Sequence, residues 1–219
     1  MTEQHWTVVD EYLTDQLQPD DPVIEAAIQE SASLPHIAVA PAQAQFLHLL
    51  VLALHARRIL EIGTLGGYSA IWMARALPTG GRLISLEISE QHATVARRNI
   101  ARAGLEGMVE VRVAPALETL EQLRAGGEEP FDFVFIDADK ANAPEYFNAA
   151  VDLAHAGSLI VVDNVVRRGK LIDSGGDDPD SEGMRRLIAT MAADPRIVPA
   201  AIQTVGVKGW DGFAFALVR

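Results

Sequence analysis

The most constraining feature of this 219-residue chain is an alternation of short apolar runs with helical stretches that begins at Arg58. The runs are RILEI, RLISLEI, VEVRV, FDFVFID and SLIVVDN, and a segment of helical spacing separates each from the next. Runs of this length are typical of strands buried on both faces, and helices are the usual crossovers between parallel strands. The pattern predicts an α/β fold with a mostly parallel sheet and helices on both faces.

Further segments flank this core. Apolar residues recur at helical spacing between Pro41 and His55, so we expect extra N-terminal helices over 1–56 and the α/β core over 57–219. One more helix is expected to end near Ala192. No linker or internal repeat divides the chain, and we therefore expect a single domain over 1–219.

The C-terminal part predicts two more strands, Ile197 to Thr204 and Gly212 to Val218, which complete a seven-stranded sheet. The short connection from Gly206 to Asp211 suits an antiparallel hairpin at the sheet edge. The Gly- and Asp-rich segment Ser174 to Asp180 is either a solvated connection or a lid over the substrate.

Composition excludes several function classes. A net charge of -12 disfavours nucleic acid as a partner, because phosphates would be repelled. The absence of cysteine excludes disulfides and thiolate chemistry, so oxygen or imidazole groups must hold any metal, and the six histidines show no metal-binding spacing. The start of the chain lacks the pattern of a signal peptide, and no apolar run has the length of a membrane span. We expect a cytoplasmic protein.

The first predicted strand ends in EIGTLGGYS, and a helix follows at once. Glycines at 63, 66 and 67 permit a tight turn that brings backbone N–H groups close to a ligand at the helix N-terminus. A dinucleotide fingerprint would need glycines at 63, 65 and 68, and Glu61 would repel a pyrophosphate. The spacing therefore argues against a nicotinamide-dependent oxidoreductase and favours a cationic or zwitterionic ligand.

The second predicted strand ends in Glu87, whose carboxylate can accept both hydroxyls of an unphosphorylated ribose. Together with the glycine turn, Glu87 favours an adenosine-containing ligand. The alternative is that the glycines serve only strand–helix packing and that Glu87 is a solvated acid.

Polar side chains also follow the fourth and fifth strands, where IDADK carries Asp137 and Lys140 and VVDN carries Asp163 and Asn164. If the strands are neighbours, Asp137, Asp163 and Asn164 meet in the crevice where open α/β sheets bind ligands. This oxygen set suits Mg²⁺, with Mn²⁺ or Ca²⁺ as alternatives. The competing interpretation is that each residue only caps the turn that follows it.

A cation at this place would lower the pKa of a substrate hydroxyl and orient its oxygen for attack on a sulfonium methyl group. Lys140 could then accept the hydroxyl proton or simply orient the anion.

These motifs resemble the cation-dependent O-methyltransferases of the catechol and caffeoyl-CoA type. The resemblance runs from VAPAQAQFL through EIGTLGGYS, LEIS, FDFVFIDADKAN and VVDNVVRRG to VGVKGWDGFAFALV, which is nearly the whole chain. It implies the Rossmann-like class I methyltransferase fold with an antiparallel C-terminal strand, S-adenosylmethionine as cofactor, a divalent cation, a small hydroxylated aromatic substrate and a homodimer.

The resemblance also implies a role for each matched residue. Cofactor roles fall on Val39, Glu61, Gly63, Thr64, Ser69, Glu87, Ala116 and Asp137. Metal roles fall on Asp137, Asp163 and Asn164, and catalytic roles on Lys140 as the base and on Asp137. His36 and Trp210 lie beside matched motifs and are candidates to line the acceptor pocket.

The chain departs from the family at Ala143 and Pro144, where a Tyr is common, so acceptor preference is expected to differ. A vicinal diol on an aromatic ring is the first substrate class expected, because adjacent hydroxyls would chelate the cation. A non-catalytic protein that binds S-adenosylmethionine, or transfer to another acceptor class, stays open as the alternative.

Overall fold

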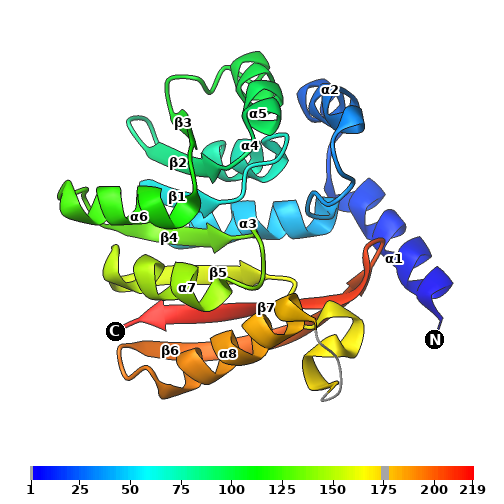
Figure 1. Ribbon diagram of the computed structural model, residues 1–219. Coiled ribbons are helices and arrows are strands. Elements are labelled where there is room, and N and C mark those ends of the chain that lie inside the picture. The colour runs from blue at the N-terminus through cyan, green and yellow to red at the C-terminus, as the bar shows by residue number, and fades with distance from the viewer. Residues whose placement is uncertain (1, 174–177) are drawn as a thin grey trace.

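In a computed structural model, which describes residues 2–173 and 178–219, a central sheet lies between two layers of helices (Figure 1). The strands are β1 (Arg58–Ile62), β2 (Arg82–Glu87), β3 (Val109–Val113), β4 (Phe131–Ile136), β5 (Ala154–Asp163), β6 (Ile197–Gly206) and β7 (Gly209–Val218). Their order is β3-β2-β1-β4-β5-β7-β6, and β7 runs antiparallel to both of its neighbours. The predicted seven-stranded sheet with an antiparallel final strand is confirmed.

Two apolar cores hold the helices to the sheet. The helices α3 (Pro41–Ala53), α4 (Tyr68–Ala74) and α5 (Glu90–Arg102) cover one face, where Phe133, Phe135 and Phe213 are buried. On the other face lie α6 (Ala116–Ala125), α7 (Ala143–Asp152) and α8 (Pro179–Ala193), packed on alternate strand residues. Successive strand residues point to opposite faces, so apolar runs are buried on both sides.

The N-terminal segment adds α1 (Glu3–Leu17), α2 (Pro22–Glu30) and the short helix η1 (Ser31–Ser33). Figure 1 shows α1 beyond the edge at which the parallel strands end, beside the β6–β7 hairpin. The 3-10 segment η2 (Arg167–Ile172) follows β5 at the same edge. Over the described ranges, none of the helices combines the length and apolar character that crossing a membrane requires.

Two sequence-based boundaries were wrong. The hairpin connection is shorter than predicted, because β6 extends to Gly206 and β7 begins at Gly209, whose φ of 87° suits a tight turn. Helix α8 begins at Pro179, within the predicted loop, because the Asp178 carboxylate caps it by accepting from the backbone N–H of Asp180. The rest of that loop, residues 174–177, lies outside the described residues.

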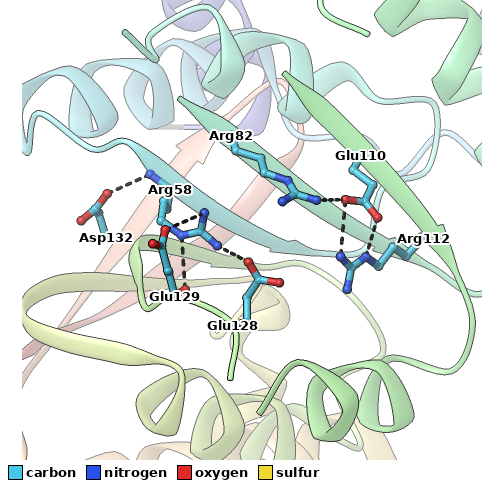
Figure 2. A network of polar contacts seen from close by, with 7 residues as sticks. All are labelled: Arg58, Arg82, Glu110, Arg112, Glu128, Glu129 and Asp132. Carbon is cyan, nitrogen blue, oxygen red and sulfur yellow. Dashed lines mark hydrogen bonds and ion pairs between the residues drawn. The ribbon is translucent and has the colours of Figure 1, made fainter. Parts of the chain in front are cut away.

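The opposite edge of the sheet carries a network of charged side chains (Figure 2). Arg58 pairs with Glu128 and Glu129, and the Asp132 carboxylate accepts the backbone N–H of Arg58 at 2.8 Å. Arg82, Glu110 and Arg112 form a second group. These ion pairs and hydrogen bonds connect β1 to β4 and the segment before it, and β2 to β3, on the side of the sheet where the parallel strands begin. The sequence motifs lie at the other edge, where these strands end.

Candidate active site

The motifs meet because four parallel strands end at one edge of the sheet. Ile62 at the end of β1 pairs with Leu86 of β2 and with Ile136 of β4, and Ile136 pairs with Val162 of β5. The residues that follow these positions are Gly63, Glu87, Asp137 and Asp163. Strand register therefore sets the predicted cofactor loop beside the predicted metal ligands.

Gly63 is required where β1 turns into its loop. Its φ is 101°, and a Cβ there would lie 2.1 Å from the backbone oxygen of Asp137. No side chain fits this close approach, and the left-handed conformation is rare for other residues. The glycine thereby lets the loop cross directly over the start of the Asp137 segment.

The Glu87 carboxylate fastens the same loop from the neighbouring strand. It accepts the backbone N–H groups of Thr64 at 3.3 Å, Leu65 at 2.9 Å and Ser89 at 2.9 Å. Leu65 is held at a positive φ of 49° within this arrangement. A carboxylate has about four acceptor positions, so Glu87 keeps capacity for a further donor such as a ribose hydroxyl.

Glu61 lies beneath the loop with no exposed surface. Its carboxyl group accepts from the hydroxyls of Ser69 and Ser85, and Ser85 in turn contacts the Thr64 hydroxyl at 2.5 Å. Burial raises the pKa of Glu61 to about 8, and the nearby charges of Asp137 and Glu87 add to the rise. The site therefore contains a buried acid whose charged form a nearby positive charge would stabilise.

Ser85 was missed by the sequence analysis. It interrupts the apolar run RLISLEI, and such a polar residue inside a buried strand was the available signal.

Lys140 and the carboxylates of Asp137 and Asp163 come together at the ends of β4 and β5. The Lys140 ammonium donates to Asp137 Oδ1 at 2.8 Å, and its side chain is only 9% exposed. Burial raises the pKa of Asp163 well above its usual range; the charge of Asp137 raises it further, and Lys140 opposes the shift. The buried Asp163 and the partly exposed Asp137 thus lie together with the Lys140 side chain beside them.

Asn164 follows directly and has a left-handed backbone, with a φ of 59°. Its N–H donates to Asp163 Oδ1 at 2.7 Å. Among the described residues, no three His, Cys, Asp or Glu side chains gather as a metal site made of these types alone would need. A site here depends on the Asn164 amide oxygen, which with two carboxylates makes a donor set suited to Mg²⁺.

Asp211 of β7 holds the loop that follows Asn164, a role that the sequence did not indicate. Its Oδ1 accepts three backbone N–H groups, those of Val166 and Arg167 at 3.0 Å and of Gly212 at 2.9 Å. Its charge also adds to the raised pKa of Asp163. The Asp-Gly pair in an otherwise apolar strand was the one local signal.

A pocket of about 450 Å³ opens beside Asp163 and Asn164. The segment from His36 to Phe46 forms one wall and the β6–β7 hairpin the other. Two contacts join these walls to each other and to α1: Lys208 donates to the His36 carbonyl at 3.1 Å, and the N–H of Val207 donates to Asp10 at 2.9 Å.

The remaining candidates lie in different places. His36, a candidate to line the acceptor pocket, and Val39, a cofactor candidate, both line this pocket. Trp210 is not among the residues that line it: its ring lies against Gly169 and its Nε1 donates to Gln203 at 2.8 Å, so the alternative of a packed Trp describes it better. Ala116 is the first residue of α6, close to Glu87 along the edge because the N–H of Ala114 donates to the Glu87 carbonyl.

Comparison with known proteins agrees with this arrangement. Residues 20–216 match the family described as O-methyltransferase. The chain belongs to this family. The predicted class, an S-adenosylmethionine-dependent O-methyltransferase, is confirmed.

Individual relatives cover all or nearly all of this O-methyltransferase. It is 52% identical over 213 residues to a catechol O-methyltransferase of Mycobacterium tuberculosis, with 96% of this chain and 95% of the relative covered. A second catechol O-methyltransferase, from Niastella koreensis, is 46% identical with full coverage of both chains. A crystal structure of an O-methyltransferase from Bacillus cereus in complex with SAH superposes with a TM-score of 0.98 at 51% identity and covers all of both chains.

Proposed function

We propose that this O-methyltransferase transfers the methyl group of S-adenosylmethionine to one hydroxyl of a catechol-type substrate, beside a divalent cation held by Asp137, Asp163 and Asn164. The observation that carries the proposal is the buried Asp163 carboxyl group beside the partly exposed Asp137, whose Oδ1 lies 2.8 Å from the Lys140 nitrogen. A carboxylate buried as deeply as Asp163 is costly unless a cation balances its charge. The names of the relatives from Mycobacterium tuberculosis and Niastella koreensis support a catechol as acceptor.

The cofactor has a place in the loop after β1. Glu87 would accept the ribose hydroxyls, and the backbone turn at Gly63 and Thr64 would receive the amino-acid part together with Ser69, while Val39 and Ala116 supply apolar contacts. Glu61 would stabilise the positive charge of the ligand from below. The SAH bound to the relative from Bacillus cereus supports a cofactor of this class.

The acceptor would enter the pocket beside Asp163 and Asn164. When bound there, a divalent cation supplies Lewis acidity that makes a contacting hydroxyl easier to ionise. Lys140 orients the hydroxyl oxygen and, as the neutral amine after its ammonium has released a proton to solvent, takes up the hydroxyl proton. The oxygen then forms a bond to the methyl carbon as the carbon–sulfur bond breaks, so the electron pair of that bond stays on sulfur and neutral S-adenosylhomocysteine leaves.

The test is transfer of a radiolabelled methyl group from S-adenosylmethionine to catechol and to caffeic acid, with Mg²⁺ and with EDTA. We expect metal-dependent turnover that Asp163→Asn lowers about 100-fold or more, since loss of cation binding removes several kcal/mol of stabilisation. Asp139→Asn is the matched control, because Asp139 lies on the same loop but bonds to Asn142 and Tyr146. Equal turnover with EDTA would contradict the metal role. Cofactor binding without turnover on any vicinal diol would favour the non-catalytic alternative.

We also propose a cytoplasmic homodimer. Exposed apolar side chains on α1 support an interface there, namely Val8, Val9, Tyr12, Leu13 and Leu17. Light scattering should give twice the chain mass of 23.6 kDa. A single-chain mass at micromolar concentration would contradict the dimer.

A further inference from the structure

Helix α8 approaches the Lys140 segment more closely than any side chain would permit. Gly183 lies inside this helix, and a Cβ there would lie 2.0 Å from the Lys140 carbonyl oxygen and 2.8 Å from the Cα of Ala141. Glycine is the least favoured helix residue after proline. Its presence here is explained by the backbone of Lys140, which occupies the space of a side chain.

The same helix also contacts the loop after β5, which follows Asp163 and Asn164. Arg167 donates to Asp180 at 3.0 Å, and Arg185 donates to the Asp173 carbonyl at 3.2 Å. Figure 1 shows α8 between α7 and η2, the two elements that come after these loops. One helix therefore touches both segments that carry the candidate catalytic side chains.

Arg186 adds a polar contact on the Lys140 side of the helix. It donates to the Ala141 carbonyl at 3.5 Å and pairs with Glu145 at the start of α7. The Lys140 segment is thus held by backbone contact at Gly183 and by Arg186 one turn further along α8.

We propose that α8 is the element that positions Lys140 for proton transfer, and that Gly183 is the positioning residue through which it acts. The inference rests on the proposed function of Lys140 as the base. The Lys140 side chain extends from this loop to Asp137 at 2.8 Å, so a displaced loop carries the amine away from the acceptor. Gly183 itself touches no substrate.

The geometry sets the size of the effect. An ordinary contact to a Cβ is 3.4 Å or more, so Gly183→Ala requires the Lys140 carbonyl to lie about 1.4 Å farther from the helix. A misplacement of about 1 Å in a catalytic group costs on the order of 100-fold in rate. We expect kcat of Gly183→Ala to fall about 100-fold, while the Kd for S-adenosylmethionine stays within about twofold because the cofactor loop is untouched.

A matched control separates positioning from general overpacking. Gly81 lies at the amino edge of the sheet, where a Cβ would meet Leu77 and the Pro78 carbonyl at 2.9 Å. Gly81→Ala should lower the melting temperature but leave kcat unchanged. A value of kcat for Gly183→Ala within twofold of the wild type would overturn the proposal. If Gly183→Ala does not fold, Arg186→Met carries the test, with kcat expected to fall about fivefold at unchanged cofactor affinity; an unchanged kcat would be equally decisive against it.

A double-mutant cycle tests whether Gly183 acts through Lys140. In the Lys140→Ala background, measured with radiolabelled cofactor, Gly183→Ala should lower kcat by less than twofold. A full 100-fold loss in that background would refute action through the lysine.

The crystal structure of Gly183→Ala tests positioning without any turnover. Displacement of the Lys140 backbone by about 1 Å would support the inference even if the wild type failed to methylate the panel. An unmoved Lys140 would overturn it.

Discussion

Glu61→Gln should abolish a pH dependence of stability that originates under the cofactor loop. Glu61 is fully buried, and its carboxyl group bonds to Ser69 and Ser85. Glutamine has nearly the same shape and can bond to both hydroxyls, but it carries no charge at any pH. The substitution therefore isolates the cost of ionising this buried acid.

The magnitude follows from the pKa of Glu61, which burial raises from 4.5 to about 8. Between these values the folded protein holds a proton that the unfolded chain has lost, so stability falls as pH rises. At 1.36 kcal/mol per pH unit, the cost of Glu61 grows by about 3 kcal/mol between pH 6 and pH 9 and levels off above pH 8. The Glu61→Gln variant does not lose this stability, because its amide cannot ionise.

The assay is urea unfolding of wild type and Glu61→Gln at pH 6, 7, 8 and 9 without cofactor. Other titrating groups are common to both proteins, so the difference in unfolding free energy reports on Glu61. From pH 6 to pH 9 the unfolding free energy of the variant should rise by about 3 kcal/mol relative to that of the wild type. A difference that does not change with pH would refute the raised pKa and with it the account of Glu61.

Three further predictions concern other parts of the chain. Gly63→Ala should lower the unfolding free energy by about 2–5 kcal/mol in urea titrations, because it combines backbone strain with a clash at 2.1 Å; a loss below 1 kcal/mol would contradict this. Asp211→Ala should weaken Mn²⁺ binding, measured by calorimetry, because it removes the acceptor of three backbone N–H groups. Asp211→Asn keeps an acceptor oxygen and should bind Mn²⁺ within about threefold of the wild type. Equal weakening in both variants would show that the charge of Asp211 matters and not its hydrogen bonds. The hydrogen bond to Asp132 raises the pKa of His155, so the charged imidazole stabilises the folded protein at low pH. His155→Gln should therefore lower the melting temperature at pH 5.5 but not at pH 9, where the wild-type imidazole has lost its charge. An equal decrease in melting temperature at both pH values would contradict this prediction.

The sequence predicted the fold well because its evidence is local. Apolar runs reveal buried strands, and parallel strands end at one edge, so residues after the runs were expected to meet there. Asp137 and Lys140 do meet Asp163 in the structure. The carboxylate oxygens of these side chains and the amide oxygen of Asn164 then favoured a divalent cation as a ligand.

What the sequence could not predict depends on the packing of distant segments. Asp211 reaches the loop after β5 only because β7 pairs with β5, and the register of that pair is not encoded near either residue. Gly183 resembles an unfavourable helix residue until the Lys140 backbone is seen against it. Trp210 was a candidate for the acceptor pocket only because it lies beside a matched motif, whereas its ring packs against Gly169 in the structure.

Asp137, Asp163 and Asn164 are proposed to hold a divalent cation at the acceptor pocket. Anomalous diffraction from crystals grown with Mn²⁺ can locate this cation, because the signal depends on the metal and not on activity. We predict one strong peak within about 2.0–2.3 Å of a carboxylate oxygen from each aspartate and of the Asn164 amide oxygen. Crystals with no peak at these three residues, or with the strong peak elsewhere, would contradict the account.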